Sequence, residues 1–207
     1  MPDLGLESVL WARGVAPVAG VDEAGRGPLA GPVAAAAVIL PDGYACPGLD
    51  DSKKLSAAKR EKVYAALTGD PAVRWAVALA DVGEIDSLNI LRATHLAMRR
   101  AVEGLGVGIG HCLVDGLPVR DFPWPHDGVV KGDGISLSIA AASVIAKVTR
   151  DRWMRTAAEE FPEYGFERHQ GYGTKDHLHA LKTHGPCRIH RRSFQPVAQL
   201  TLPFGPA

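Results

Sequence analysis

Residues 18–40 read VAGVDEAGRGPLAGPVAAAAVIL, two apolar runs on either side of a glycine-rich turn. The first run covers residues 18–21 and ends in the acidic pair Asp22 and Glu23, and the second covers residues 33–40. Short apolar runs bounded by glycine and proline are typical of buried β-strands. The stretch therefore predicts two strands, with two carboxylates where the first strand ends.

The rest of the chain alternates between further apolar runs and helical patterns. The predicted further strands cover residues 73–80, 111–114 and 129–130, and the predicted helices cover 56–67, 85–105 and 136–160. Ser56 is suited to cap the first of these helices. The second helix is predicted from apolar residues that recur on one face, namely Leu88, Leu91, Met98, Val102 and Leu105.

Strands that alternate with helices indicate an α/β fold with a mixed central sheet of about five strands, flanked by helices. A chain of 207 residues is long enough for one large domain. We expect a single catalytic domain with a core of about residues 15–160. A small C-terminal helical appendage of about residues 161–195 and a tail of residues 196–207 would complete it.

Composition and charge are those of an ordinary globular protein. Hydrophobic residues make up 46% of the chain and charged residues 22%, and 23 basic residues balance 23 acidic ones. A net charge of zero is a mild argument against binding to nucleic acid, since such proteins usually carry a basic surface. Residues 186–194, however, contain three arginines and a histidine without any acid, so a local basic face is possible.

The chain shows no targeting or membrane signal. Its N-terminus lacks the basic and apolar regions of a signal peptide, and its longest apolar run, residues 33–40, is too short to cross a bilayer. The three cysteines, Cys46, Cys112 and Cys187, are an odd number that suits a reducing cytoplasm. We therefore expect a soluble cytoplasmic monomer without a membrane anchor.

Acidic side chains interrupt the apolar runs where the chain leaves the predicted sheet. Asp22 and Glu23 end the first strand, Asp115 ends the fourth, and Asp133 follows the fifth. Adjacent strand ends would bring the four carboxylates into one crevice, where they repel one another unless a cation neutralises them. Oxygen ligands favour Mg²⁺ or Mn²⁺ over zinc, and two such ions about 4 Å apart can catalyse phosphoryl displacement. The alternative is that the acids are turn formers or helix caps.

Two further segments are candidates for binding phosphate or hydroxyl oxygens. Gly25, Arg26 and Gly27 follow the acids directly, and glycines let backbone N–H groups approach a ligand closely. The glycine spacing does not fit the dinucleotide-binding fingerprint. Lys53 and Lys54 precede a predicted helix start, where a bound phosphate would explain two cations that oppose the helix dipole. A solvated turn is the alternative for the lysine pair.

Seven segments form a set that follows one order along the chain. They are GVDEAGRGPLAGPV (20–33), DSKKLS (51–56), LNILRAT (88–94), VDG (114–116), KGDGISLSIAAASVIAKVTRD (131–151), YGFERHQGYGT (164–174) and HGPCRIHRRSF (184–194). Together they resemble the ribonuclease HII family over nearly the whole chain, and the first and fifth are long and specific. The main departure is Gln170, a position where the family often has a basic residue.

This resemblance implies a ribonuclease H fold and an endonuclease that hydrolyses the RNA strand of RNA–DNA hybrids. It also implies cleavage on the 5′ side of ribonucleotides embedded in duplex DNA, which leaves 3′-hydroxyl and 5′-phosphate ends. The family's two-metal site, for Mg²⁺ or Mn²⁺, falls on the four acids already singled out, Asp22, Glu23, Asp115 and Asp133.

The resemblance also assigns substrate-binding roles. Gly25, Arg26 and Gly27 would read the 2′-hydroxyl, the group that distinguishes RNA from DNA locally. Tyr172 would stack on the sugar of the adjoining deoxynucleotide, with a buried core aromatic as the alternative. Lys53 and Lys54 would hold backbone phosphates. Further candidates for duplex contacts, with helix packing or surface solvation as the alternative, are Asn89, Ser143, Lys147 and Arg150.

Other interpretations fit the sequence less well. A catalytically silent hybrid-binding module would need a broken acid set, and a phosphohydrolase of small nucleotides would need no long track of basic residues. Ribonuclease HIII carries an additional N-terminal domain and a glutamate as its fourth acid, whereas the fourth acid here is Asp133. The histidines and Cys187 within residues 177–190 match no compact zinc motif. We therefore expect neither zinc nor an organic cofactor.

The end of the chain contains a candidate docking peptide. Residues 199–204, from Gln199 to Phe204, read QLTLPF and look like the short peptide by which bacterial replication and repair proteins bind the sliding DNA clamp. Pro196 and Pro203 prevent the tail from extending a helix, and its apolar side chains would be costly to expose without a partner pocket. The alternative is that the tail folds back onto its own domain.

Overall fold

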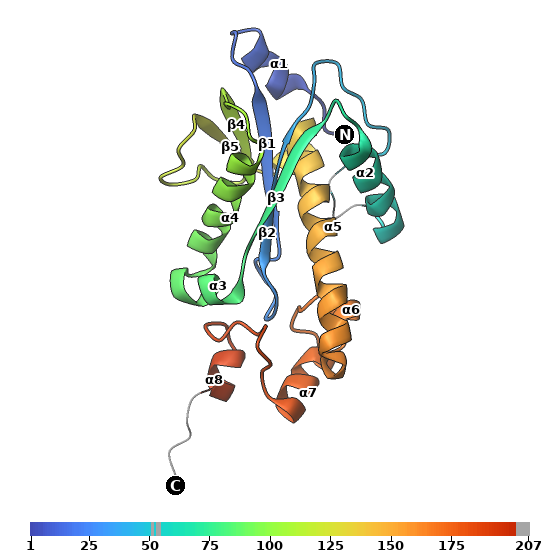
Figure 1. Cartoon of the computed structure of the whole chain (residues 1–207), viewed down its shortest axis with the longest axis vertical. Coiled ribbons are helices and arrows are strands. Elements are labelled where there is room, and N and C mark those ends of the chain that lie inside the picture. The colour runs from blue at the N-terminus through green and yellow to red at the C-terminus, as the bar shows by residue number, and fades with distance from the viewer. Residues whose placement is uncertain (51, 53–54, 202–207) are drawn as a thin grey trace.

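Five strands form one mixed sheet in the computed structural model, which describes residues 1–50, 52 and 55–201. The order across the sheet is β3-β2-β1-β4-β5, and Figure 1 shows the strands between two helical layers. The three strands β1, β2 and β3 are antiparallel, whereas β4 and β5 run parallel to β1. The bounds are Val18–Ala24 for β1, Val33–Ile39 for β2, Arg74–Ala80 for β3, His111–Asp115 for β4 and His126–Val129 for β5. The predicted α/β fold is confirmed.

Helices cover both faces of the sheet. On one face α3 (Val82–Leu88) and α4 (Ile90–Gly104) bury apolar residues against the sheet, and on the other α2 (Ala57–Gly69) and α5 (Leu137–Glu160) do the same. The closest approach is between α5 and β1, because a Cβ on Gly20 would lie 2.2 Å from the backbone carbon of Ser138. This close packing holds α5 directly behind the strand that carries the first two acids.

The remaining helices are short. A helix that the sequence did not predict, α1 (Gly5–Trp11), packs near the start of α5. The others, α6 (Phe166–His169), α7 (Lys175–His184) and α8 (Val197–Thr201), lie at the opposite end of the molecule, at the bottom of Figure 1, where α6 packs on the far end of α5. Their core contains stacked Tyr164 and Phe166, with ring centroids 5.2 Å apart. Within the described residues, no helix is long and apolar enough to cross a membrane.

Three boundary predictions need correction. The single helix predicted over residues 85–105 is two helices, because Asn89 adopts a φ of 69° and breaks the chain between α3 and α4. This break turns Leu88 and Leu91 outward, and they are 37% and 49% exposed. Strand β5 lies at His126–Val129 and not at residues 129–130, and β1 continues through both acids to Ala24.

Candidate active site

A cavity of about 230 Å³ opens beside the carboxyl ends of β1 and β4. Parallel strands end at the same edge of a sheet, and an open α/β sheet commonly binds its ligands there. The cavity gathers three of the predicted acids, the glycine turn, Tyr172 and one side of α5. Its lining residues are Asp22, Glu23, Ala24, Gly25, Arg26, Gly27, Ser52, Asp115, Ser143, Lys147, Arg150 and Tyr172.

Two acids meet because β1 and β4 are adjacent and in register. Val21 pairs with Val114, so the next residues along the two strands, Asp22 and Asp115, end up side by side. Asp22 is only 4% exposed, and its Oδ1 accepts the N–H of Glu23 at 2.6 Å. Burial, and then the charges of Glu23 and Asp115, raise the pKa of Asp22 well above its ordinary value. Such a group of carboxylates is a donor set that fits a hard divalent cation.

Asp133 is buried next to this cavity but does not line it. It lies in the 3₁₀ turn Gly132–Gly134, and the N–H of Gly132 donates to Oδ1 of Asp115 at 2.7 Å. This bond ties the turn that carries the fourth acid to the end of β4. Over residues 1–50, 52 and 55–201, no three acidic, histidine or cysteine side chains form a ready-made metal cluster.

The turn after β1 has a backbone that only glycine suits. Gly25 has a φ of 98°, and a Cβ on it would lie 2.0 Å from Nε of Arg150. Gly27 faces the tyrosine, because a Cβ there would be 3.5 Å from Cε1 of Tyr172. The side chain of Arg26 reaches back to Oε1 of Glu23 at 3.3 Å. The turn therefore brings backbone next to both the acids and the aromatic ring.

Tyr172 is an exposed wall of the cavity. The residue is 46% exposed, so the alternative of a buried core aromatic is wrong. Its backbone is fixed at both ends, because its N–H donates to the carbonyl of His169 and its carbonyl oxygen lies 2.9 Å from Nδ1 of His177. The ring is thus presented to solvent on a rigid support.

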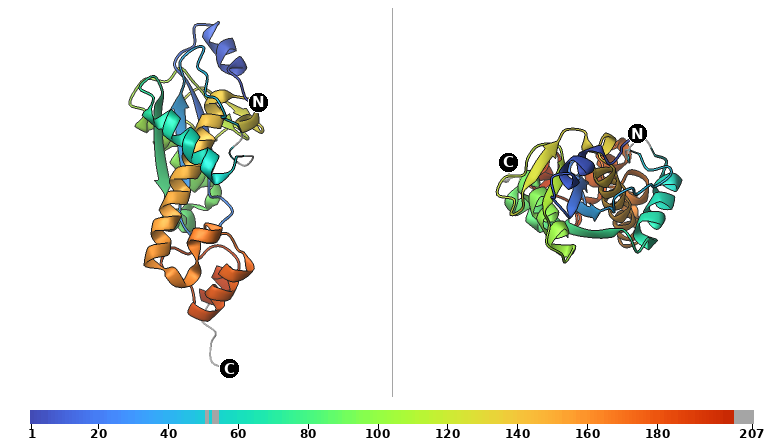
Figure 2. Two further views of the ribbon diagram at one scale, coloured as in Figure 1. Left: turned by 90° about the vertical axis from the view of Figure 1, so that its right-hand side faces the viewer. Right: turned by 90° about the horizontal axis from the view of Figure 1, so that it is seen from above.

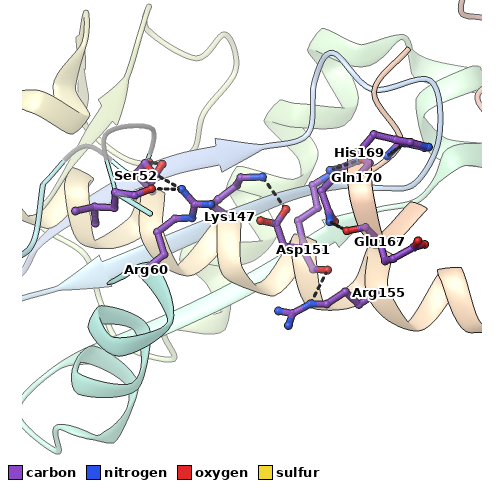
Figure 3. Close-up of polar contacts among 12 residues, drawn as sticks. Ser52, Arg60, Lys147, Asp151, Arg155, Glu167, His169 and Gln170 are labelled. Carbon is purple, nitrogen blue, oxygen red and sulfur yellow. Dashed lines mark hydrogen bonds and ion pairs between the residues drawn. The ribbon is translucent and has the colours of Figure 1, made fainter. Parts of the chain in front are cut away.

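The face of α5 toward the cavity supplies Ser143 and Lys147. Ser143 is buried, hydrogen-bonds Oγ of Ser52 at 2.9 Å, and lowers the pKa of Asp22 through a further hydrogen bond. Figure 3 shows Lys147 turned toward Asp151, with Nζ 2.7 Å from Oδ1, and Arg60 holding the carbonyl of Ser52. Ser52 was not predicted as a site residue, although its serine-lysine-lysine setting is visible in the sequence.

One predicted contact, Asn89, lies elsewhere. Asn89 is exposed at the junction of α3 and α4, outside the residues that line the cavity, where its Oδ1 accepts the N–H of Arg92 at 3.1 Å. Lys53 and Lys54 lie outside the described residues. The segment that carries these lysines flanks Ser52, which does line the cavity.

Comparison with known proteins identifies the family. The family model described as Ribonuclease HII matches residues 19–197 of the chain. The chain belongs to the ribonuclease HII family. It therefore has the endonuclease activity of a ribonuclease HII, in a family that depends on divalent metal ions.

Individual relatives agree with this assignment. Ribonuclease HII of Myxococcus xanthus (strain DK1622) is 54% identical over 204 residues, which cover 98% of this chain and 69% of that protein. Ribonuclease HII of Rhodospirillum rubrum is 53% identical over 203 residues, 96% of this chain and 91% of that one. The structure of the PCNA:RNase HII complex from Archaeoglobus fulgidus superimposes with a TM-score of 0.74 at 24% identity, covering 87% and 96% of the two chains. The last likeness concerns the fold alone.

In this ribonuclease HII, Arg150 is a buried structural group and not an exposed duplex contact. It is 1% exposed, and its guanidinium donates to the carbonyls of Pro32, Ala30 and Gln170 at 2.9–3.1 Å. Burial lowers its pKa to about 10. Arg150 therefore packs beneath the glycine turn. This supports the alternative given for it above, packing within the fold in place of contact with the duplex.

In the ribonuclease HII structure, the basic segment 186–194 contains one buried arginine and two exposed ones. Arg188 forms an ion pair with Glu160, and Arg191 is fully buried under the glycine turn. The backbone N–H of Arg192 donates to Asp86. Sequence reasoning missed Arg191 as a site component, because an arginine doublet after a histidine reads as an exposed charge run unless its tertiary contacts are known.

Two histidines of this ribonuclease HII, His177 and His190, form a hydrogen-bonded chain that ends at the carbonyl of Tyr172. The N–H of Cys187 donates to Nδ1 of His190 at 3.0 Å, which leaves the ring proton on Nε2. That proton points at Nε2 of His177, 3.0 Å away, so Nδ1 of His177 donates to the carbonyl of Tyr172. Burial lowers the pKa of both imidazoles, that of His190 to about 4. Both rings are therefore neutral at pH 7 and act as structural supports.

Proposed function

We propose that the cavity hydrolyses a phosphodiester in the RNA strand of RNA–DNA hybrids and cuts on the 5′ side of ribonucleotides embedded in duplex DNA. The products would be 3′-hydroxyl and 5′-phosphate ends. One observation carries the proposal: the acids Asp22, Glu23 and Asp115, the glycine turn and the exposed Tyr172 all line one cavity. Groups for the chemistry and groups for recognition of a nucleotide are thus within reach of a single substrate residue.

Four carboxylates are the proposed ligands of the divalent cations, Mg²⁺ or Mn²⁺. Asp22, Glu23, Asp115 and Asp133 would hold two ions, and the chemistry that such ions would supply is activation of a water molecule and neutralisation of charge on the phosphate. Burial, and then the charges of Glu23 and Asp115, disfavour the charged form of Asp22, and a divalent cation would let all three stay ionised. Ser143 keeps the Asp22 side chain oriented by hydrogen bonding to it.

Recognition of the ribonucleotide would come from the turn and the ring. The backbone N–H groups of the turn formed by Gly25, Arg26 and Gly27 would donate hydrogen bonds to a 2′-hydroxyl, and Tyr172 would offer a face for stacking on the neighbouring sugar. Lys147 on α5 borders the same cavity, and we assign it, with Lys53, Lys54 and Asn89, to the duplex backbone. We further propose that the chain works as a cytoplasmic monomer with one catalytic domain.

A strand-specific cleavage assay tests this function. The substrate is an end-labelled DNA duplex with one ribonucleotide, incubated with Mg²⁺, Mn²⁺ or EDTA, beside an all-DNA duplex of the same sequence. We expect a cut only with metal, only in the ribonucleotide strand, and a product that a DNA polymerase extends from its 3′-hydroxyl. Equal cleavage of the all-DNA duplex, or a cut on the 3′ side, would contradict the proposal.

The tail supports a second interaction of the same enzyme, with a sliding clamp. In α8, Val197 is fully buried against Leu29 and Leu181, whereas Gln199 and Leu200 are exposed. The first part of the tail thus folds back onto its own domain, and the residues that open the candidate peptide face solvent. Leu202, Pro203 and Phe204 lie outside the described residues. A relative, the archaeal ribonuclease HII, has been solved in complex with PCNA, which makes clamp binding chemically reasonable here.

A further inference from the structure

Two guanidinium groups are buried behind the glycine turn, and the proposed chemistry uses neither of them. Arg150 comes from the middle of α5, and Arg191 follows the His190 bridge to Ala30 near the end of the chain. Their exposed fractions are 1% and 0%. Arginine is seldom fully buried without a paired acid, so the partners of these two side chains need an explanation.

Arg191 binds the turn through backbone carbonyls. Its Nη2 donates to the carbonyl of Gly25 at 2.6 Å, Nη1 to that of Arg26 at 2.9 Å, and Nε to that of Gly31 at 2.9 Å. Its own N–H donates to the carbonyl of Leu29 at 2.8 Å. Arg150 holds the other end of the same loop through Ala30 and Pro32. The loop is therefore fixed from behind by donors that come from two distant parts of the chain.

This arrangement determines which way the neighbouring N–H groups point. In a trans peptide the carbonyl of one residue and the N–H of the next lie in the same plane and point in opposite directions. Because the carbonyls of Gly25 and Arg26 point inward to Arg191, the N–H groups of Arg26 and Gly27 point outward. Arg26 and Gly27 both line the cavity, so N–H groups that point away from Arg191 are available to a ligand bound there.

The buried charges also act on these N–H groups electrostatically. Burial, and then the charge of Arg150, lower the pKa of Arg191 to about 9, whereas Asp86 and Tyr172 oppose the shift. The acceptors of its guanidinium hydrogen bonds are neutral carbonyls. A hydrogen bond to a carbonyl polarises the peptide and strengthens its N–H as a donor. Two cations behind the turn therefore favour an electron-rich oxygen in front of it.

We propose that Arg191, together with Arg150, is a positioning residue for ribonucleotide recognition: it orients and polarises the Arg26 and Gly27 N–H groups toward a substrate oxygen. The inference rests on the proposed function and adds to it the two arginines that hold the backbone of Gly25, Arg26 and Gly27 in position. Arg191 does not touch the substrate. Its effect is on discrimination between ribose and deoxyribose and not on the hydrolytic step.

The test compares binding of two duplexes that differ in one 2′-hydroxyl. With Ca²⁺ in place of Mg²⁺, the dissociation constants are measured for a duplex with one ribonucleotide and for the all-DNA duplex. In Arg191→Lys, a single ammonium replaces a fork that spans several carbonyls. We expect the preference for the ribonucleotide to fall at least tenfold, with affinity for all-DNA changed less than twofold. For Arg191→Ala, added methylguanidinium should restore the preference.

A matched control is available three residues away. Arg188 is an exposed arginine paired with Glu160, so Arg188→Lys should keep the wild-type preference and melting temperature. The proposal is overturned if Arg191→Lys keeps the preference. It is also overturned if Arg191→Lys weakens both duplexes equally while its melting temperature falls, because that is the behaviour of a purely structural residue.

A measurement on the unmodified protein covers the case in which the variants do not fold. In ¹⁵N-labelled protein, the amide signals of Arg26 and Gly27 should shift with the ribonucleotide duplex and not with the all-DNA duplex. Unchanged amide signals would overturn the proposal. If the unmodified protein binds both duplexes equally and cuts neither, the proposed function itself fails, which is a separate outcome.

Discussion

At the scale of single residues, the site places acidic groups where their own charges oppose one another. Asp22 is buried, and its raised pKa comes first from desolvation and then from Glu23 and Asp115. For an acid whose folded pKa lies above its unfolded value, ionisation destabilises the fold as the pH rises from the unfolded value through the folded one. Neutralising the side chain should therefore cost the protein activity and not stability.

Replacement of Asp22 by asparagine tests that expectation. Asp22→Asn keeps an oxygen that can accept the N–H of Glu23 but removes the charge, so cleavage should be abolished. At pH 7 the melting temperature should be unchanged or higher, and its difference from wild type should shrink at acid pH, where Asp22 is protonated in both states. Asp133→Asn should also abolish cleavage. Thermal melts across pH check both variants, and loss of folding together with activity would point to structural acids.

The exposed ring permits a second test at this scale. Tyr172→Ala should weaken transition-state stabilisation on a single embedded ribonucleotide by about 1–3 kcal/mol, the typical value of stacking on an aromatic side chain. Because the residue is 46% exposed, the melting temperature should hardly change. Values of kcat/KM on single-ribonucleotide and long-hybrid substrates decide the matter. Equal losses on both would mean that the ring does not choose the cleavage position.

Sequence reasoning worked well for residues whose role depends on local pattern. Asp22, Glu23 and Asp115 each interrupt an apolar run, and strand adjacency then brings them to one cavity. It left open whether Arg150 packs within the fold and missed Arg191, because an arginine reads as exposed unless the carbonyls around it are known. Except for that of Gln170, those carbonyls belong to a loop more than a hundred residues away in the sequence.

At the scale of elements, the junction of α3 and α4 shows how one side chain ends a helix and begins another. Asn89 has φ 69° and ψ 163°, a region that is strained for every residue except glycine. Its side chain compensates in part by capping α4 at the N–H of Arg92. Periodicity could not reveal the break, since the apolar spacing continues through it and only the backbone conformation interrupts the helix.

The backbone strain and the helix cap at Asn89 can be separated by two substitutions that should affect the free energy of unfolding differently. Asn89→Gly removes the strain and loses only a few tenths of a kcal/mol of capping, so the free energy of unfolding should be unchanged or higher. Asn89→Ala keeps the strain and loses the cap, which should cost about 1–2 kcal/mol. Urea denaturation measures both. If Asn89 contacts the duplex, both variants should also raise KM, whereas an unchanged KM would remove it from the substrate-binding residues.

The appendage should respond to pH through its neutral histidines. The pKa of His190 is about 4 in the folded state against an ordinary value of 6.5, so the unfolded state binds more protons between these values. The free energy of unfolding should therefore fall as pH drops from 6.5 to about 4, by up to about 3 kcal/mol from this residue. Urea titrations at several pH values measure the slope, and His190→Asn should flatten it. An identical slope in the variant would mean that other groups cause it.

At the scale of the whole molecule, the tail combines a packing contact with a proposed docking peptide, and a simple truncation would remove both. A chain that stops at Gln195 loses buried Val197 as well as the candidate clamp peptide. Composition alone could not separate these roles, because a buried and an exposed apolar residue, Val197 and Leu200, lie only three positions apart in α8.

Point substitutions separate them. Gln199→Ala combined with Leu200→Ala changes exposed side chains, so the melting temperature should be kept while binding to a bacterial sliding clamp is lost in a pull-down. Val197→Ala should destabilise the protein by about 1–3 kcal/mol and keep clamp binding at low temperature. Full clamp binding by the double variant would leave the tail with a packing role only.

The hydrogen bond from Arg191 to the carbonyl of Arg26 joins residues 165 positions apart. At a synthesis rate of about 5–20 residues per second, roughly ten to thirty seconds separate the two residues on the ribosome. For part of that interval, the nascent polypeptide already contains all four acids but lacks the arginine that fixes the turn. A product released early at a premature stop codon would carry the carboxylates without a properly held loop beside them. The turn beside the four acids can therefore take up its final, hydrogen-bonded conformation only after nearly the whole chain has been synthesised.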